Sequence, residues 1–215
     1  DDAYAAVTPL CVMADWGWHT TPAPTPQGRY TLEELRKLDF GIRRGEPFEG
    51  MQIPTFEEIL RKFAARVIMN IHVKIWDMIR ISTNKNIDPK LCEIAALIKK
   101  YDCEKHVYFM TTNDAIIKRV MEYAPDVKIC VGWDGNKEPS SIVDRAIALG
   151  AYKVQLFKPY FDQAAIDKAH AHGILCNVFW ADDPEEAIRY REMGIDTILT
   201  NDYLPIKRAF KGTSL

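Results

Sequence analysis

The sequence predicts an α/β fold, a TIM (β/α)8 barrel that is incomplete at its N-terminus. From Val67 onward, strand-like apolar runs alternate with helical patterns at a spacing of about 20–25 residues, the size of a βα repeat with short loops. Such alternation indicates a parallel sheet, and nearly continuous apolar runs are typical of strands covered on both faces. Polar or aromatic residues follow the strand ends, where a barrel places its functional groups. No GxGxxG motif follows any strand, which disfavours a doubly wound nucleotide-binding sheet.

The repeat after Val67 predicts a definite order of strands and helices. We expect strands at residues 67–74, 107–111, 127–133, 153–157, 174–180 and 197–200. We expect helices at residues 89–100, 114–123, 140–149, 163–172 and 184–193. Three of these helices are followed by a glycine, which suits the left-handed residue after a helix, namely Gly150, Gly173 and Gly194.

The first 66 residues are less regular. We expect a short strand at residues 9–13, then a proline-rich loop, then helices at residues 31–39 and 55–65. Each helix starts with a capping box, Thr31 with Glu34 and Thr55 with Glu58. We interpret residues 1–215 as one barrel domain with a loop-rich insertion at residues 16–54. The two strands that a barrel still lacks are expected from residues 1–66, from sequence before Asp1, or from a partner chain.

Composition excludes some classes of partner. The net charge of −2 gives no support for a nucleic-acid partner, and no apolar run approaches the roughly 20 residues of a membrane span. The first residues include neither Met nor a signal-peptide pattern, so we expect sequence upstream. The five cysteines are odd in number and form no CxxC pair, which favours buried thiols and a cytoplasmic location.

The strand at residues 67–74 carries three polar side chains on one face. Asn70, His72 and Lys74 are spaced by two, so they project together, opposite Ile71 and Val73. An amide, an imidazole and an ammonium are costly to bury without partners. This face is therefore predicted to open onto a wet cleft or to hold a charged ligand.

Several segments resemble the glycerophosphodiester phosphodiesterase family. The segments are YTLEELRKLDFG, IPTFEEIL, NIHVK and the closing GIDTILTNDY, and the family patterns are TLEEL, IPTLEEVL, NIEIK and GxDxIxTD. The resemblance covers residues 9–208. It implies a barrel that hydrolyses phosphodiesters of glycerol with a divalent metal, Ca²⁺ or Mg²⁺, and with two histidines as acid and base. It also implies a role in lipid metabolism.

The family's functional residues carry over only in part. Lys74 matches the lysine that contacts the phosphate, and Trp180 matches the tryptophan at the end of the seventh strand. His72 stands where the family has a metal-binding glutamate, and Ala14 stands where it has the second histidine. The HRG segment is absent, and Asp1 or Asp2 falls near the aspartate of the family's Glu-x-Asp metal pair; we assign Asp2.

Two replacements follow as hypotheses. His72 is predicted to be a metal ligand in place of the carboxylate, which would shift the preference toward Zn²⁺ or Mn²⁺; the alternative is an imidazole that only hydrogen-bonds a neighbour. His19 is predicted to replace the missing catalytic histidine near Ala14, and the alternative is an exposed loop residue. With Lys74, these residues are the candidate catalytic and metal-binding groups.

A substrate wall is predicted at the strand ends. Trp133 and Trp180, with Gln155, are the candidate substrate-binding residues beside Lys74, and core packing is the alternative for the tryptophans. The leading function is metal-dependent hydrolysis of a small-molecule phosphodiester. The alternatives are an impaired or repurposed barrel that binds a phosphorylated or sugar ligand, and a barrel completed by another copy in a homo-oligomer.

Overall fold

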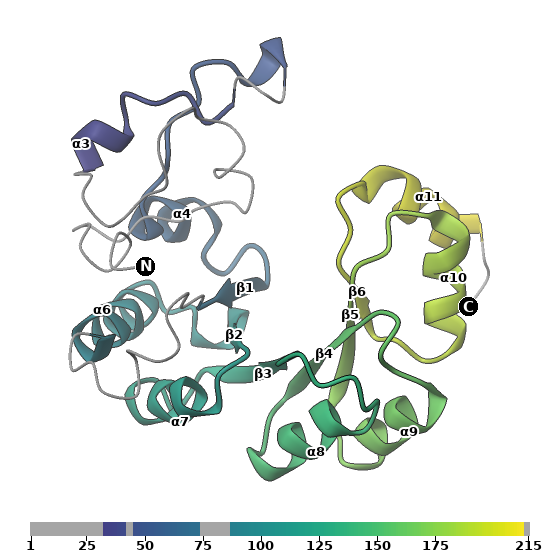
Figure 1. The fold of residues 1–215 in the computed structure, drawn as a ribbon. Coiled ribbons are helices and arrows are strands. Elements are labelled where there is room, and N and C mark those ends of the chain that lie inside the picture. Colours follow the sequence, from purple (N-terminus) through teal and green to yellow (C-terminus); the bar gives the residue numbers. More distant parts are fainter. Residues whose placement is uncertain (1–31, 42–44, 74–86, 213–215) are drawn as a thin grey trace. The chain divides into compact units, whose positions relative to one another are not determined.

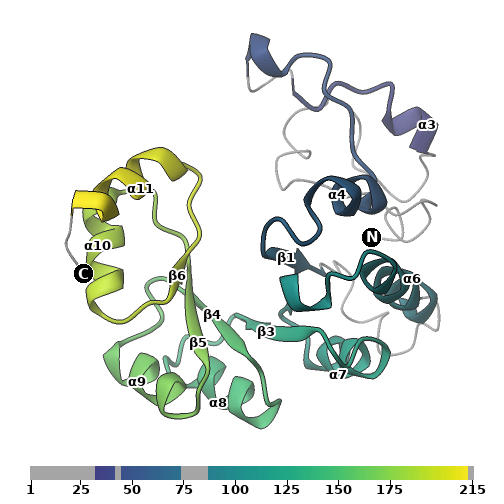
Figure 2. The same cartoon turned by 180° about the vertical axis from the view of Figure 1, so that it is seen from behind.

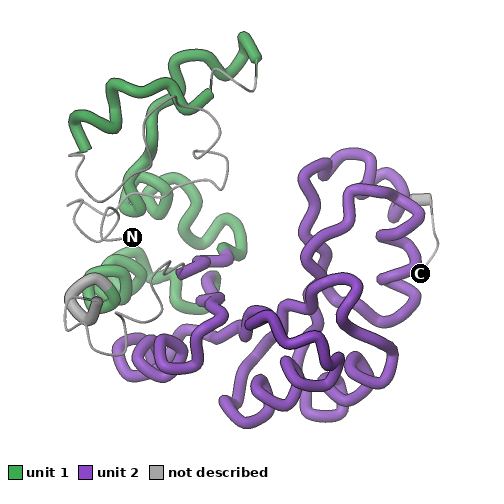
Figure 3. The backbone as a smooth tube through the Cα atoms, in the orientation of Figure 1, with its two compact units in different colours: residues 1–69, 74–106 green, residues 70–73, 107–215 purple. Residues whose placement is uncertain are grey.

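The structure is a computed structural model that describes residues 32–41, 45–73 and 87–212. The strand expected at residues 9–13, the capping residue Thr31, and the candidate residues Asp2, His19 and Lys74 lie outside these ranges. The chain divides into two compact units, residues 1–69 with 74–106 and residues 70–73 with 107–215 (Figure 3). We describe each unit by itself.

The second unit is built on a six-stranded sheet whose strand order follows the chain (Figure 1). Every pair from β2 to β6 is parallel. The main-chain N–H of Val73, just after β1, donates to the carbonyl of Met110 at 2.9 Å. The strands are β1 Met69–His72, β2 Val107–Thr111, β3 Lys128–Gly132, β4 Lys153–Phe157, β5 Leu175–Phe179 and β6 Thr197–Ile198.

Helices follow the strands and cover one face of this sheet (Figure 2). The side chains that meet them are fully buried aliphatic residues such as Val131, Val154 and Leu156. Helix α7 packs on β2 and β3, α8 on β3 and β4, and α9 on β5, while α10 packs on α11. The helices are α7 Asp114–Tyr123, α8 Ser141–Ala148, α9 Gln163–Ala171, α10 Pro184–Glu192 and α11 Tyr203–Gly212.

Local signals in the sequence explain where these helices begin and end. Asn113, Asp162 and Asp183 each accept main-chain N–H bonds in the first turn of α7, α9 and α10. These bonds satisfy donors that lack a partner within the helix. Gly150, Gly173 and Gly194 have positive φ angles of 62°, 69° and 96°, as predicted for residues that end a helix.

The first unit contains α3 Leu32–Leu35, η2 Glu46–Phe48, α4 Phe56–Phe63, α6 Ile87–Lys100 and η3 Glu104–His106. The capping box predicted for α4 is present, with Thr55 and Glu58 exchanging hydrogen bonds. Glu58 also pairs with Arg36 at 2.7 Å. Glu57 accepts hydrogen bonds from Lys100 at 2.6 Å and from the Tyr101 hydroxyl at 3.1 Å, which joins α4 to α6.

The six strands and their helices confirm the predicted α/β barrel fold, but some details differ. Strand β1 is shorter than expected and is not buried, because it is the edge strand of the described sheet. Helix α3 spans four residues, and α11 was not predicted. Cys103, Cys130 and Cys176 are buried as expected, whereas Cys92 is exposed. In the described ranges, no helix is long and apolar enough to cross a membrane.

Candidate active site

A chain of polar side chains lies on the sheet face opposite the helices. Lys153 donates to the Thr197 hydroxyl at 3.2 Å, and that hydroxyl donates to the Asn177 Oδ1 at 3.0 Å. The Asn177 amide donates to the Gln155 Oε1 at 3.1 Å. Gln155 and Asn177 are register partners in β4 and β5, so their side chains share one face. Because Asn177 is only 1% exposed, these bonds replace the water that burial removed.

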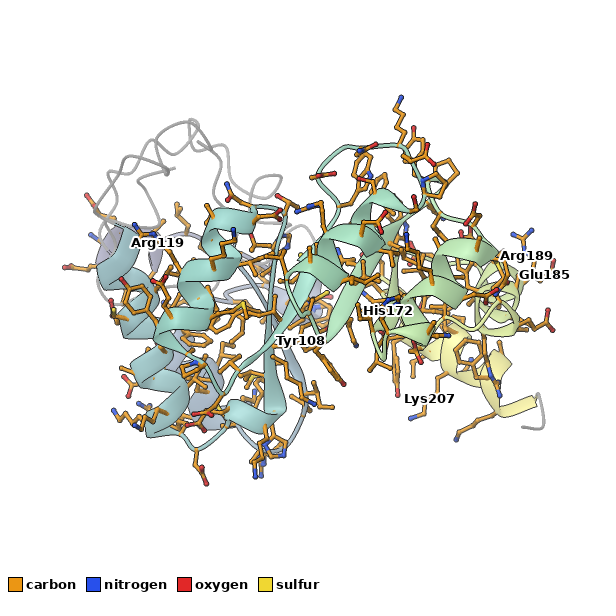
Figure 4. All side chains as sticks on the ribbon, turned by 90° about the horizontal axis from the view of Figure 1, so that it is seen from below. Tyr108, Arg119, His172, Glu185, Arg189 and Lys207 are labelled. Atoms are coloured by element: carbon orange, nitrogen blue, oxygen red, sulfur yellow. The ribbon has the colours of Figure 1, made fainter. Side chains whose placement is uncertain are left out.

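Lys153, at one end of this hydrogen-bonded network, also contacts an aromatic ring. The Lys153 ammonium lies 4.9 Å from the centre of the Tyr108 ring, in the range of a cation–π interaction. Figure 4 labels Tyr108 beside the strands, and burial raises the pKa of its hydroxyl to about 12. Burial also lowers the pKa of Lys153. Lys153 and Tyr108 are therefore largely removed from solvent, and their contact anchors the network that continues to Gln155.

An aromatic row lies at the C-terminal ends of the strands β3 to β5. Trp133 stacks on Phe157 with ring centres 4.4 Å apart, and Phe157 lies 5.8 Å from Phe179. Phe179 meets Trp180 edge-on at 5.1 Å, and Tyr160 stacks on Trp133 at 5.5 Å. The rings are half-buried, so they pack on one another and still offer surface. Such a surface suits the carbon face of a small polyol or alcohol.

Two lysines border the aromatic row, Lys137 at the Tyr160 ring and Lys158 at the Trp180 ring. The Lys158 ammonium lies 5.2 Å from the centre of the Trp180 ring and forms an ion pair with Glu186 at 2.7 Å. Both charged side chains are mostly buried, at 28% and 19% exposure, so the pair fixes Lys158 beside the tryptophan. The cation and the ring together offer a site for a ligand with an apolar face and a negative or hydroxyl group.

Arg145 ties together the C-terminal ends of β2 and β3. Its guanidinium donates to the main-chain carbonyls of Thr112 and Gly132 at 3.0 and 3.2 Å. It also pairs with Asp114 at 2.5 Å and Asp134 at 3.1 Å. The planar, forked guanidinium has five N–H donors, which allows it to reach all four partners at once. Since Trp133 lies between Gly132 and Asp134, Arg145 holds the backbone that carries the first ring of the row.

Asp182, which follows β5, connects its own loop to the segment that follows β6. Its carboxylate accepts bonds from the Thr200 hydroxyl and from the main chain and side chain of Asn201. These hydrogen bonds, first that of the Asn201 side chain, hold the pKa of Asp182 below its usual value. At the start of α10, Asp182 thus connects two loops, and Asp183 caps the helix by accepting from the Glu186 N–H.

His72 ends strand β1 with an exposed side chain. Desolvation by the surrounding protein lowers the pKa of its imidazole from 6.5 to about 4. Contact of the exposed ring with water opposes part of that effect, and both contributions leave the imidazole neutral at pH 7. A neutral imidazole is the form that binds a metal ion. In the part of the chain that the structure describes, no converging group of metal-ligating side chains includes His72.

The structure brings together some of the predicted site residues. Trp133 and Trp180 belong to one aromatic row, and Gln155 belongs to the polar chain on the same sheet face. The roles predicted for these residues and for His72 stay predictions. Sequence reasoning missed Phe157 and Phe179, although Phe157 follows the candidate residue Gln155 by two positions and therefore shares its face. No local signal indicated Arg145, because its partners lie on other elements.

Comparison with known proteins gives one consistent family. Residues 17–204 match the model of the glycerophosphoryl diester phosphodiesterase family. A glycerophosphodiester phosphodiesterase from Caldanaerobacter subterraneus subsp. tengcongensis is 29% identical over 175 residues, which cover 80% of this chain and 68% of that protein.

Solved structures agree on the fold. A phosphodiesterase from Oleispira antarctica, in complex with the product sn-glycerol-3-phosphate, matches with a TM-score of 0.77 and 18% identity over 93% of this chain and 78% of that one. A glycerophosphodiester phosphodiesterase from Agrobacterium tumefaciens matches with a TM-score of 0.69 and 18% identity over 93% and 80%. With the family model spanning most of its length, this chain belongs to the glycerophosphoryl diester phosphodiesterase family.

Proposed function

We propose that the protein hydrolyses glycerophosphodiesters to an alcohol and glycerol phosphate, with the help of a divalent metal ion. The observation that carries this proposal is the family match over residues 17–204. The structure of the Oleispira relative, which holds sn-glycerol-3-phosphate as product, supports the same substrate class. The aromatic row beside Lys158 is a suitable surface for the substrate's alcohol and glycerol groups.

The reaction requires a base, an acid and compensation of the phosphate charge. Water attacks the phosphorus, the bond from phosphorus to the alcohol oxygen breaks, and that oxygen takes up a proton. Lys74 is proposed to contact the phosphate as a positive point charge. His19 is proposed to exchange the protons, because Ala14 has no group that can do so.

The metal would be held by His72 together with Asp2. His72 fits this role because its imidazole is neutral at pH 7 and exposed at a strand end. A bound divalent ion supplies positive charge to the phosphate oxygens. Ca²⁺ and Mg²⁺ prefer oxygen ligands, whereas imidazole suits Zn²⁺ and Mn²⁺, so we propose a shift toward the latter pair.

The substrate would lie against residues at the C-terminal ends of the strands. Trp133 and Trp180 are proposed to contact its carbon face, and Gln155 is proposed to hydrogen-bond a hydroxyl group. The Gln155 Oε1 already accepts from Asn177, which leaves its amide N–H groups directed away from that bond. Hydrolysis of this kind would place the protein in the turnover of phospholipid headgroups.

The assay is release of sn-glycerol 3-phosphate from glycerophosphocholine. The purified chain is treated with EDTA and then supplied with Mg²⁺, Ca²⁺, Mn²⁺ or Zn²⁺ at one ionic strength. We expect product with Mn²⁺ or Zn²⁺ above that with Mg²⁺ or Ca²⁺, and none with EDTA. Equal turnover with and without EDTA contradicts the metal requirement.

A second function is favoured by two replaced residues. His72 and Ala14 stand where the family pattern has a glutamate and a histidine, so the barrel could bind a phosphorylated or sugar ligand without turning it over. Saturable calorimetric binding of sn-glycerol 3-phosphate, without turnover in any metal, would favour this function. Light scattering tests the homo-oligomer, and a clean monomer contradicts it.

A further inference from the structure

A histidine, a cysteine and an aspartate converge where β5 and β6 begin. His170 lies in the last turn of α9, Cys176 is the second residue of β5, and Asp196 directly precedes β6. One imidazole nitrogen, one sulfur and one carboxylate oxygen lie within 4.8 Å of one another. The aromatic row lies at the opposite, C-terminal end of β5, so the cluster is separate from the candidate active site.

We propose that His170, Cys176 and Asp196 form a second metal site, which takes a borderline transition-metal ion such as Zn²⁺. Nitrogen, sulfur and carboxylate ligands in one cluster are the combination that Zn²⁺ accepts, whereas Ca²⁺ and Mg²⁺ select oxygen ligands. Three protein ligands leave one tetrahedral position for water. This site does not depend on the proposed phosphodiesterase function.

The three ligand atoms would need to move only slightly to reach the distances of a tetrahedral metal site. The His170 Nε2 lies 3.0 Å from the Asp196 Oδ2. Tetrahedral Zn²⁺ with its usual bond lengths would hold nitrogen and oxygen about 3.3 Å apart, and sulfur about 3.6 Å from either. Since no pair of ligand atoms exceeds 4.8 Å, the largest required movement is about 1 Å.

The surroundings hold the three groups in place. The main-chain N–H of Cys176 donates to the same Asp196 oxygen at 2.7 Å, which fixes the carboxylate against the strand. Cys176 is fully buried, whereas the side chains of His170 and Asp196 are 38% and 30% exposed. An ion can therefore enter from one side and meet the sulfur at the bottom of the site.

Binding breaks the Cys176 S–H bond, forms a sulfur–metal bond and releases the proton to solvent. Burial, with the charge of Asp196, raises the pKa of the thiol to about 12, so the free protein holds that proton. The charge of the metal ion compensates for its loss. Without a metal, the cluster is a histidine–aspartate hydrogen bond beside a buried thiol, and the experiment must distinguish this from a metal site.

The experiment is a Co²⁺ titration of the EDTA-treated chain, read by absorption spectroscopy. A thiolate bound to Co²⁺ produces a near-ultraviolet charge-transfer band, which oxygen and nitrogen ligands at the proposed active site do not produce. We expect one equivalent of this band, and its loss on addition of Zn²⁺. Absence of the band from the wild-type chain overturns the proposal.

Matched variants assign the band to these residues. Cys176→Ser should remove it, whereas Cys130→Ser, at another fully buried strand cysteine, should keep it. His170→Gln should weaken Co²⁺ binding at least about tenfold, since loss of a ligand costs no less than loss of an outer partner. His172→Gln, two residues further on and exposed, is its control. A band that survives in a folded Cys176→Ser chain contradicts the site, and so does an unchanged Co²⁺ affinity in a folded His170→Gln chain.

Discussion

The His72 side chain is exposed, yet its pKa is lowered in the folded chain. This predicts how the stability of the fold changes with pH. Its pKa falls from 6.5 to about 4 in the folded chain. As the pH falls, His72 therefore binds a proton near pH 6.5 in the unfolded chain but only near pH 4 in the folded chain. Stability from this residue is present above pH 6.5 and is lost as the pH falls through this window.

Nuclear magnetic resonance of the His72 ring protons measures this directly. We expect a titration midpoint well below 6.5, and the assignment is made by loss of the signal in His72→Gln. The same variant should show a shallower fall of unfolding free energy between pH 6.5 and 4. A midpoint at 6.5 or higher would contradict the neutral imidazole.

A second change at His72 tests its proposed place in metal binding. His72→Glu restores the carboxylate of the family pattern. Because carboxylate oxygen suits Mg²⁺ and Ca²⁺ while imidazole suits Zn²⁺ and Mn²⁺, the variant should shift preference toward the first pair. Calorimetric titration of each metal measures the shift. Unchanged affinities in both His72→Glu and His72→Ala would exclude His72 as a ligand.

The buried amide of Asn177 is predicted to matter for stability. Asn177→Ala removes one partner each from Gln155 and Thr197 and should cost about 1–3 kcal/mol, the usual effect of leaving buried polar groups unsatisfied. Urea unfolding measures it. Because Gln155→Leu acts on the same bond, the double variant should cost less than the sum of the two; simple additivity would contradict the coupling.

At the scale of elements, α4 offers a test with an internal control. Thr55 accepts from the N–H of Glu58 in a complete capping box, whereas Ser140 at the start of α8 makes no side-chain capping bond. Thr55→Ala should therefore destabilise the chain by about 1 kcal/mol, and Ser140→Ala should change little. Equal losses in urea unfolding would show that the cap is not the cause.

Arg145 connects the ends of β2 and β3, and the sequence alone did not indicate this contact. Arg145→Met removes the hydrogen bonds to Thr112 and Gly132 and two ion pairs, and should cost about 2 kcal/mol because the side chain is only 16% exposed. Lys118→Met on α7, which is exposed, should stay within about 0.5 kcal/mol. A similar effect of both changes would argue against the role of Arg145.

For the whole molecule, the fold was largely predictable because its signals are local. The apolar runs predicted β2 and β4 at their observed bounds, and the helical patterns between strands predicted α7 at its observed bounds and α9 to within one residue. Helix α11, which follows the last expected strand at residues 197–200, was not predicted. The burial of β1 was overestimated because its apolar composition says nothing of its edge position.

The site was less predictable because it depends on contacts between distant residues. Trp133 and Trp180 could be named from their places at strand ends, but the row between them needs the register of β4 and β5. The joining of His170 to Asp196 spans 26 residues and two elements, and no spacing in the sequence indicates it. Motifs thus locate the candidate active edge, while the structure adds the residues that support it.

We expect the strand-end face of this barrel to cleave a phosphodiester, and the decisive measurement is the steady-state rate of sn-glycerol 3-phosphate release by Lys74→Met. The proposed contact of Lys74 with the phosphate predicts a loss of about 100-fold or more, as for other charge-stabilising donors. Lys118→Met is the matched control and should keep the wild-type rate. If the wild-type chain releases product and Lys74→Met does so at the rate of the control, Lys74 does not contact the phosphate in the reaction.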